Sequence, residues 1–363
     1  MIPDCGIIPI EKWGIFEDGA PYVIAGPCSA ESESQVIQTA LGLRKAGISV
    51  FRAGLWKPRT RPGCFEGVGE QGLEWLGRVR RETGMKVCTE VAGAKHVAAV
   101  ADAGVDMVWI GARTTANPFL VEEIAGALEG SDMPVLVKNP VSPDIDLWIG
   151  AVERLQRHGI RKIAVVHRGF TTTSAIEYRN APGWNIAVDF RSRFPEIPFF
   201  CDPSHMGGSR KFIREISQRA MDLGLDGLMI ESHCKPECAL SDASQQLEPE
   251  ELADILSSLS IRVSDSDDSI YRKTVADFRD RIDYLDTSIV DLLAARMDIC
   301  REIGRIKKDH NISILQTGRW EEALSLAVSE AVAKGLDAGF VKAVFNEIHN
   351  ASIAEQNKIL ENS

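Results

Sequence analysis

Four side chains that can bind a metal ion follow short apolar runs in this sequence. Cys28, His205 and Glu231 each come at or soon after the end of such a run, and Asp242 lies a little further along. Carboxylates at the end of a buried strand are poorly explained by packing. One thiol, one imidazole and two carboxylates suit one divalent transition metal ion (Mn, Fe, Co or Zn) better than Mg or Ca. Cys28 alone also fits a buried apolar role and His205 a loop role, so the predicted metal site depends on the four lying together.

Basic side chains follow several of the other apolar runs. They are Arg59, Arg113, Lys138 and Arg168. If the runs form one parallel sheet, these cations converge at one end of it, where their repulsion is destabilising unless anions bind. Guanidinium groups also bind phosphate and carboxylate with a forked geometry that lysine cannot match. A solvated surface charge explains any one of the four, but the set predicts a site for several phosphates or carboxylates.

Eight apolar runs alternate with segments of helical periodicity and would position these residues. The runs are 22–25, 49–53, 86–89, 107–110, 135–137, 163–166, 199–201 and 228–230. Several intervening segments begin at Ser, Thr or Asp and end at Gly, as helices do. Eight strand–helix units over about 240 residues have the size of a (β/α)8 TIM barrel, whose active sites lie on the loops after the strands.

Polar side chains of functional type follow every one of the eight runs. They are Cys28, Lys57 with Arg59, Glu90, Arg113, Lys138, His167 with Arg168, Asp202 with His205, and Glu231. An open, doubly wound sheet binds ligands only where its strand order reverses. A complete ring of functional strand ends therefore favours the closed α/β barrel, with the open sheet as the alternative.

Composition limits the classes of protein and partner. With 363 residues and 44% hydrophobic content, the chain can form one large and one small domain. The net charge of -11 argues against nucleic-acid and anionic-membrane partners. The 8 cysteines lack the spacing of a disulfide framework, and no apolar run approaches the roughly 20 residues of a membrane helix. We therefore expect a cytoplasmic enzyme with reduced thiols.

Six short motifs resemble those of one enzyme family in their order along residues 20–255. They are Gly26-Pro27-Cys28-Ser29, Lys57-Pro58-Arg59-Thr60, Gly111-Ala112-Arg113, His167-Arg168-Gly169, Asp202-Pro203-Ser204-His205 and Ser241-Asp242. The sequence resembles the 3-deoxy-D-arabino-heptulosonate 7-phosphate (DAHP) synthases. The resemblance implies condensation of phosphoenolpyruvate with erythrose 4-phosphate, the first step of the shikimate pathway, on a metal-containing barrel.

The resemblance also implies a role for each matching residue. It assigns the metal to Cys28, His205, Glu231 and Asp242. It assigns phosphoenolpyruvate to Arg113, Lys138 and Arg168, and the phosphorylated aldehyde to Lys57, Arg59 and Thr60. Lys138 and Glu90 are the candidate catalytic residues of the barrel, Glu90 as a group that handles a proton or water. Long members of the family place a lysine where this chain has Phe65-Glu66, so it resembles the short variant and leaves one substrate contact unassigned.

The related enzyme that uses arabinose 5-phosphate is the natural competing assignment. It shares the barrel and the phosphoenolpyruvate site, but its aldehyde loop reads Lys-Ala-Asn-Arg. This chain has Lys57-Pro58-Arg59-Thr60 at that place. The loop therefore favours the four-carbon sugar.

A second domain is predicted after a polar, acidic linker. We place the barrel at 1–260, the linker at 261–269 and a small all-α domain at 270–363. From Val275 to Ile306, apolar residues recur in alternating steps of three and four, which predicts one long helix with a coiled-coil seam. Shorter helices are expected at 319–333 and 337–360. Three helices are too few to bury so long a seam, so we expect this domain to form a homodimer.

One basic residue interrupts that seam. Arg296 stands where the rhythm requires an apolar residue, and an unpaired arginine there would be strongly destabilising. An ion pair with an acid of a partner helix is one explanation. Arg279, Lys307 and Arg319 lie on or beside the same surface, however, and four cations predict a bound anion.

The C-terminal segment resembles the small all-helical chorismate mutases. The resemblance implies rearrangement of chorismate to prephenate in an interlocked dimer, a reaction that needs only charge and orientation. The matching positions are Arg279, which would reach across from the other subunit, and Arg296, Lys307, Gln316, Arg319, Ser352 and Gln356. Arg296, Lys307 and Gln356 are the candidate catalytic residues, with Lys307 and Gln356 on the ether oxygen.

Two departures from the mutase family keep a second interpretation open. The acids that usually face the substrate hydroxyl correspond to Gln316 and Trp320 here. The domain is therefore either a working mutase or a non-catalytic regulatory and dimerisation module that binds chorismate or prephenate. Either form could give feedback, and we hypothesise that prephenate bound there restrains the barrel enzyme.

Overall fold

The structure is a computed structural model of the chain. It describes residues 6–17, 19, 21–57, 63, 65–173, 176–262, 266–315 and 317–361, apart from the side chains of 317–319. The chain divides into two compact units, Met1–Ser264 and Asp265–Ser363. The limits of the predicted linker, 261–269, stay a prediction.

The first unit is a closed barrel of parallel strands. Strand β1 pairs with both β2 and β8, which closes the ring β1-β2-β3-β4-β5-β6-β7-β8. The strands are β1 Tyr22–Gly26, β2 Val50–Arg52, β3 Lys86–Val91, β4 Met107–Ile110, β5 Val135–Lys138, β6 Ile163–His167, β7 Phe199–Cys201 and β8 Gly227–Glu231. Each predicted run overlaps one of these strands: two runs coincide with their strands, one contains β2, and the other five lie within theirs. The predicted (β/α)8 barrel is therefore confirmed, and the open-sheet alternative is wrong.

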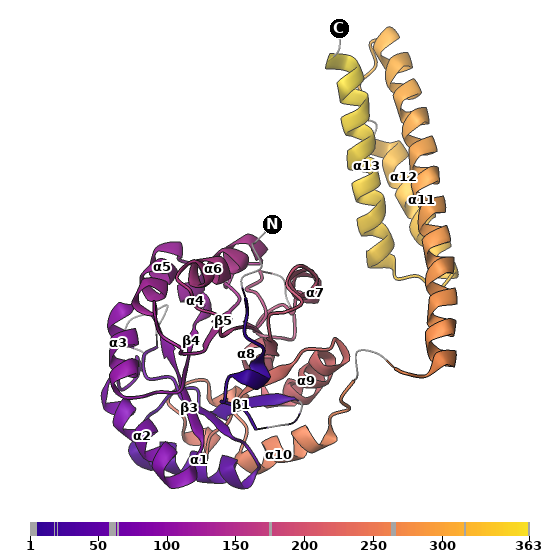
Figure 1. Ribbon diagram of the computed structural model, residues 1–363. Helices are drawn as coiled ribbons and strands as arrows, with labels where there is room; N and C mark the ends of the chain where they lie inside the picture. Colours follow the sequence, from indigo (N-terminus) through magenta and orange to yellow (C-terminus); the bar gives the residue numbers. More distant parts are fainter. Residues whose placement is uncertain are drawn as a thin grey trace. The chain divides into compact units, whose positions relative to one another are not determined.

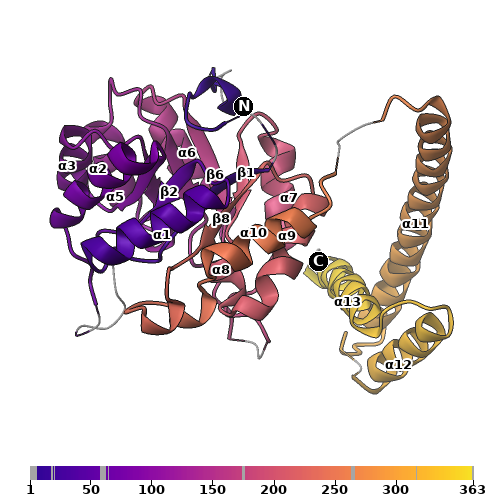
Figure 2. The ribbon, with the colours of Figure 1, turned by 90° about the horizontal axis from the view of Figure 1, so that it is seen from below.

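Helices surround the strands, as Figures 1 and 2 show from two directions. They are α1 Glu33–Lys45, α2 Gln71–Thr83, α3 Ala94–Asp102, α4 Ala112–Thr115, α5 Pro118–Ala127, α6 Ile145–Arg157, α7 Trp184–Arg193, α8 Pro203–Gly207, α9 Ile213–Asp222 and α10 Pro249–Ser258. Short 3-10 helices lie at η1 Ile10–Lys12, η2 Arg210–Phe212, η3 Pro236–Cys238 and η4 Ala243–Gln245. The extra helices α4 and α8 directly follow β4 and β7, where the site residues Arg113 and His205 are found.

The barrel has an inner and an outer apolar core, because strand side chains alternate between two faces. Ile24 of β1 packs in the inner cluster and Ala25 in the outer one, beneath the helices. The N-terminal residues Ile10 and Trp13 also join the inner cluster. They approach from the amino ends of the strands, which leaves the carboxyl ends for polar side chains.

Gly26 allows β1 and β2 to lie close together beside the predicted metal site. Its φ is +151°, and a Cβ there would be 2.0 Å from the carbonyl oxygen of Arg52. Gly26→Ala is expected to destabilise the barrel by about 3 kcal/mol, measured by urea unfolding. Gly47→Ala is the control, because its φ is +82° and no atom lies within 4 Å, so only backbone strain of about 1–2 kcal/mol applies. Equal losses in the two variants would contradict the steric explanation.

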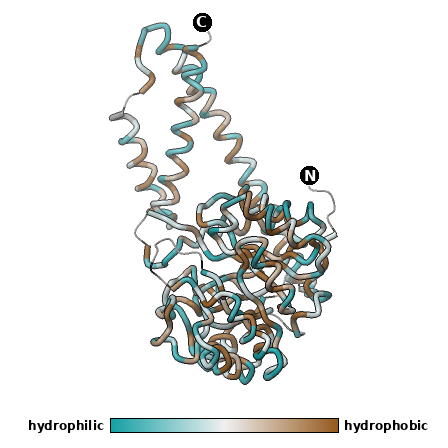
Figure 3. Tube along the Cα trace, turned by 90° about the vertical axis from the view of Figure 1, so that its left-hand side faces the viewer, coloured by the Kyte–Doolittle hydropathy of each residue, from teal (hydrophilic) through white to brown (hydrophobic). Residues whose placement is uncertain are grey.

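The second unit consists of three helices, as predicted. They are α11 Ser269–Asp309, α12 Thr317–Ala333 and α13 Ala338–Glu361, and α13 packs against both of the others. Only Cys300 and Gly304 of the 41-residue helix α11 are buried in this unit. Hydrophobic and hydrophilic residues alternate along these helices in Figure 3. Among the described residues, no helix has the length and apolar character needed to cross a membrane.

Candidate active sites

The carboxyl ends of the barrel strands surround a polar cavity of about 280 Å³. Parallel strands of a barrel bring the residues that follow them to one mouth. Among the predicted residues, those that line the cavity are Lys57, Glu90, Arg113, Lys138, Arg168, His205 and Asp242. The structure thus places cations and metal donors from six different strand ends around one space.

Three of the four predicted metal ligands form a compact donor cluster. One ligand atom each from Cys28, Glu231 and Asp242 lies within 4.8 Å of the others. The Cys28 thiol donates a hydrogen bond of 3.3 Å to Asp242 Oδ2. Asp242 has a φ of +51°, which is uncommon outside glycine and marks a strained position of the kind found at functional sites.

His205 lies beside the donor cluster without belonging to it. Its Nε2 is 3.6 Å from Glu231 Oε1, and its Nδ1 is 2.7 Å from Asp202 Oδ2. Glu231 Oε1 is buried and accepts no hydrogen bond from the described residues, although Arg52 Nη2 lies 3.3 Å away. A buried carboxylate oxygen with spare accepting capacity, close to a thiol and an imidazole, fits a divalent cation.

The charges around the thiol influence its protonation. Burial and the Glu231 carboxylate raise the pKa of Cys28 to about 12. The Lys57 ammonium donates a hydrogen bond of 3.2 Å to the sulfur. Burial lowers the pKa of Lys57, but Cys28 and Glu90 outweigh that effect, and the net shift is upward. The lysine therefore keeps its positive charge within the cluster.

Buried positive charge also lines the cavity, at Lys138 and Arg168. Lys138 Nζ donates a hydrogen bond of 2.6 Å to Asp202 Oδ2, and burial lowers the pKa of this lysine. Burial also lowers the pKa of Arg168 to about 10, and the neighbouring Arg179 and Arg113 contribute to this shift. Guanidinium groups that disfavour one another's charge are stabilised when an anion binds between them.

Arg168 is held in position by several polar contacts. Its Nη1 donates to Asn180 Oδ1 at 2.9 Å, and its backbone N–H donates to Asn139 Oδ1 at 2.7 Å. The preceding His167 is fully buried, and burial lowers its pKa to about 4. His167 is therefore neutral near pH 7, and its Nε2 carries the hydrogen donated to the carbonyl oxygen of Pro182. Arg168 is therefore held by Asn180 and Asn139, and no positive charge on the adjacent His167 repels it.

A second group of polar side chains lies between α11 and α13 of the helical unit. Arg296 Nη1 donates a hydrogen bond to Ser352 Oγ. Gln356, one turn after Ser352, is buried, and its Oε1 accepts no hydrogen bond from the described residues. Lys307 Nζ donates to the carbonyl oxygen of Ile314 at 2.6 Å. The Arg296 guanidinium and the Gln356 amide thus lie on two helices that pack together, and both groups can donate hydrogen bonds to an anion.

Each of the two units matches the model of a known protein family. Residues 9–264 match the model of the DAHP synthetase I family, and residues 278–357 match that of chorismate mutase type II. The chain belongs to the DAHP synthetase I family. Its second unit adds a mutase-type segment, so the predicted fusion of the two families is confirmed.

Individual relatives agree with the assignment of this DAHP synthetase I family member. A phospho-2-dehydro-3-deoxyheptonate aldolase of Thermotoga maritima is 36% identical over 226 residues, which are 62% of this chain and 65% of the relative. A 2-dehydro-3-deoxyphosphooctonate aldolase of Nitratidesulfovibrio vulgaris is 29% identical and covers 66% of this chain and 90% of its own length. The crystal structure of the Thermotoga maritima DAHP synthase superposes with a TM-score of 0.58 at 33% identity, covering 65% of this chain and 67% of that one.

Two arginines of this DAHP synthetase I barrel were missed from the sequence. Arg52 is 1% exposed, pairs with Glu231 and lies 4.6 Å above the Trp109 ring. Arg179 donates to Asp242 Oδ1 at 3.0 Å and to Gln245 Oε1 at 2.8 Å. Arg52 interrupts a buried apolar run, which is a detectable signal, whereas no local pattern marks Arg179.

Glu90 of the family barrel is buried against the chain at the start of α4. A Cβ on Gly111 would lie 2.1 Å from Glu90 Oε1, so only glycine leaves room for this carboxylate. Glu90 also contributes to the raised pKa of Lys57. The carboxylate thus lies inside the cavity, where a proton or a water molecule can be exchanged with it.

Several predicted residues are not placed in the two sites. Arg59, Thr60 and Gln316 lie outside the described residues, as does the side chain of Arg319. Arg279 is exposed on α11 within the single chain. Trp320 stacks on His349 with ring centroids 3.9 Å apart.

Proposed function

We propose that the barrel condenses phosphoenolpyruvate with erythrose 4-phosphate to form DAHP. The observation that carries this proposal is the cavity in which Arg113, Lys138 and Arg168 face the Cys28–Asp242 donor cluster. Such an arrangement binds an anionic substrate and activates a carbonyl group in one space. The Thermotoga relative has the corresponding aldolase name.

The residues of the chain have separate roles in this mechanism. Arg168 and Arg113 hold the phosphate and carboxylate of phosphoenolpyruvate and fix its orientation. Lys138 adds a positive charge, and its hydrogen bond to Asp202 keeps the ammonium aimed into the cavity. Glu90 holds or moves a proton of a water molecule. A divalent transition metal held by Cys28, His205, Glu231 and Asp242 would polarise the aldehyde oxygen.

Substrate choice is the sharpest test of the barrel assignment. The purified full chain should form DAHP from phosphoenolpyruvate and erythrose 4-phosphate, followed by consumption of phosphoenolpyruvate. Arabinose 5-phosphate is the matched alternative substrate, because the Nitratidesulfovibrio relative is a 2-dehydro-3-deoxyphosphooctonate aldolase. Faster turnover of the five-carbon sugar would reverse the assignment, and no turnover of either would exclude both.

The helical unit is proposed to rearrange chorismate to prephenate. Its support is the contact between Arg296 and Ser352 beside the buried Gln356 amide, because two carboxylates and an ether oxygen require such donors. The alternative is a module that binds chorismate or prephenate without turnover, and Trp320 at a usual acid position favours it. Chorismate added to the full chain separates the two, since binding without prephenate formation would leave only the module.

The helical unit is also proposed to form the homodimer. Leu285 and Leu292 on α11 are 57% and 71% exposed, which is unfavourable for an apolar seam in water. The double variant Leu285→Glu/Leu292→Glu is expected to sediment as a monomer. Thr287→Glu is the control, because Thr287 is exposed on the opposite side of α11 and should leave the dimer intact. A wild-type monomer, or a dimer that survives both leucine changes, would contradict this interface.

Feedback by prephenate remains our proposal for the fused arrangement. Prephenate bound in the helical unit would slow the barrel reaction. The test is the synthase rate of the full chain in millimolar prephenate, with Arg296→Ala as the variant that should lose the effect. A synthase rate that prephenate does not change would contradict this proposal.

A further inference from the structure

Two adjacent glutamines, Gln245 and Gln246, are buried beside the metal donors and take no part in the proposed mechanism. They are 1% and 0% exposed. The short helix η4 ends at Gln245, and Leu247 then pairs in parallel with Ser232, directly after β8. Burial of two amides is unfavourable unless their donors and acceptors find partners. The partners of these amides therefore indicate what the pair does.

Gln246 joins the two chain segments that carry Cys28 and Asp242. Its Oε1 accepts a hydrogen bond of 2.9 Å from the Cys28 backbone N–H, and its Nε2 donates one of 2.8 Å to the Ser241 carbonyl oxygen. The hydroxyls of Ser29 and Ser241 form a second connection between the same segments. The separation of the thiol from the carboxylate, 3.3 Å between Cys28 Sγ and Asp242 Oδ2, therefore depends on this amide.

Gln245 determines which oxygen of Glu231 is available to a metal ion. Its Nε2 donates a hydrogen bond of 2.6 Å to Glu231 Oε2, whereas Oε1 accepts no hydrogen bond from the described residues. Oε1 is also the oxygen that lies 3.6 Å from His205 Nε2. Gln245 thus engages one carboxylate oxygen and leaves the other beside the imidazole.

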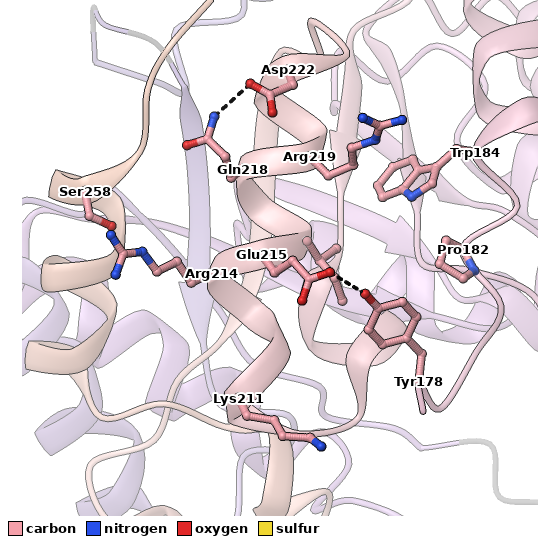
Figure 4. A pocket seen from close by; sticks show the side chains of 11 residues that line it. Tyr178, Pro182, Trp184, Lys211, Arg214, Glu215, Gln218, Arg219, Asp222 and Ser258 are labelled. Atoms are coloured by element: carbon pink, nitrogen blue, oxygen red, sulfur yellow. Dashed lines mark hydrogen bonds between the residues drawn. The ribbon is translucent and has the colours of Figure 1, made fainter. Parts of the chain in front are cut away.

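The oxygen of the Gln245 amide acts on a second carboxylate through an arginine. Gln245 Oε1 accepts a hydrogen bond of 2.8 Å from Arg179 Nη1, which also donates to Asp242 Oδ1 at 3.0 Å. The chain is anchored next to this arginine, because the Tyr178 hydroxyl donates a hydrogen bond of 2.7 Å to Glu215 of α9 (Figure 4). Gln245 therefore helps to hold Asp242 as well as Glu231.

Only an amide can make both contacts at each of these positions. Gln245 accepts from a guanidinium and donates to a carboxylate, and Gln246 accepts from a backbone N–H and donates to a carbonyl oxygen. An ionised glutamate has no hydrogen to donate, and a methionine has neither an N–H nor an O–H group. The two side chains are therefore matched to their partners in both donor and acceptor.

We propose that Gln245 and Gln246 are positioning residues that set the affinity of the barrel for its divalent transition metal. Gln246 fixes the spacing of Cys28 and Asp242, and Gln245 orients Glu231. Groups that orient metal ligands in this way typically change metal affinity by about tenfold to a hundredfold. This inference rests on the metal site of the proposed function and adds to it the residues that hold the ligands in place.

The test is a titration of the metal-free full chain with Co²⁺, followed by the charge-transfer absorption between the Cys28 thiolate and cobalt. Gln245→Met and Gln246→Met nearly keep the side-chain volume but remove both hydrogen bonds. Each should raise the Kd of Co²⁺ at least about tenfold. Gln156→Met is the matched control and should bind Co²⁺ as the wild type does, because Gln156 is half-buried near the end of α6 and does not line the cavity.

The two glutamine variants should also differ from each other in the spectrum of bound cobalt. Gln246→Met releases the segment of Cys28, so the charge-transfer absorption per bound Co²⁺ should fall. Gln245→Met acts on the carboxylates and should leave that absorption unchanged. A general loss of stability predicts no such difference, and elemental analysis gives the amount of bound metal.

Two results would overturn the inference. One is a Kd of Co²⁺ that neither Gln245→Met nor Gln246→Met changes, and the other is an equal increase in Gln156→Met. If circular dichroism shows that a methionine variant does not fold, the corresponding asparagine variant replaces it. Asparagine keeps the amide but is one methylene too short to reach both partners, so the Kd should again rise, and an unchanged Kd would overturn the inference.

The Co²⁺ titration does not depend on catalysis. Wild-type protein that binds Co²⁺ but forms no DAHP would refute the proposed condensation and leave the role of the two glutamines intact. Wild-type protein that binds no Co²⁺ would overturn the metal site and this inference together. The two failures are therefore distinguishable.

Discussion

Removal of the divalent metal by a chelator is expected to abolish the condensation reaction and to leave the mutase reaction unchanged. The rate of DAHP formation should fall at least about a hundredfold, because a bound cation contributes several kcal/mol of charge stabilisation at an oxygen. The donors concerned, Cys28, Glu231 and Asp242, all belong to the barrel unit. Addition of a divalent transition metal should restore the rate.

Substitution of Cys28 tests whether the required metal binds at this thiol rather than elsewhere in the protein. Cys28→Ser should remove most bound metal, measured by elemental analysis, together with most of the condensation rate. Cys234→Ser is the matched control, because Cys234 is half-buried in the barrel and does not belong to the donor cluster. A Cys28→Ser protein with full metal content and activity, or a chelated enzyme that keeps its rate, would refute the assignment.

The residues at strand ends were predictable from the sequence because a parallel barrel converts order along the chain into position around a ring. Lys138 and Glu231 are the last residues of their strands, and Glu90 is next to last. Once the apolar runs are recognised as strands, these side chains must lie at one mouth. Arg168 directly follows β6, Arg113 lies in α4 three residues after the end of β4, and both line the cavity, as this reasoning predicts.

The supporting residues were not predictable because their contacts are not local. Gln245 Nε2 donates to Glu231 Oε2 at 2.6 Å, and Gln246 Oε1 accepts from the Cys28 backbone N–H, which joins the segments that follow the neighbouring strands β8 and β1. Asn180 reaches Arg168 from a loop without regular structure. Such amide and loop residues have no periodicity, and only the folded chain shows which strand ends they join.

The helical unit shows the same division between pattern and contact. A basic residue inside an apolar seam made Arg296 recognisable, because periodicity defines where an apolar side chain is expected. Its partner Ser352 lies on another helix, and the hydrogen bond between them joins residues far apart in the sequence. The stacking of Trp320 on His349 was likewise not foreseeable, and it replaces an expected acid with an aromatic pair.

Arg296→Ala is expected to lower the kcat of chorismate rearrangement about a hundredfold to a thousandfold, as removal of one charge-stabilising donor does in other enzymes. Arg296→Lys should recover only part of the rate, because a lysine cannot form the forked contact. The condensation rate of the barrel should stay unchanged in both variants. The rate of rearrangement is measured as the rate at which chorismate disappears.

Arg301→Ala provides the matched control on the same helix. Arg301 pairs with Asp298 and Glu355 at the surface of the unit, and surface pairs contribute little. Its kcat should change less than about threefold. If Arg296→Ala kept the wild-type rate, or if both arginine variants lost activity together with helical content by circular dichroism, the catalytic role of Arg296 would be wrong. If kcat falls in Arg296→Ala but not in Arg301→Ala, and both variants keep their helical content, the positive charge of Arg296 takes part in the reaction.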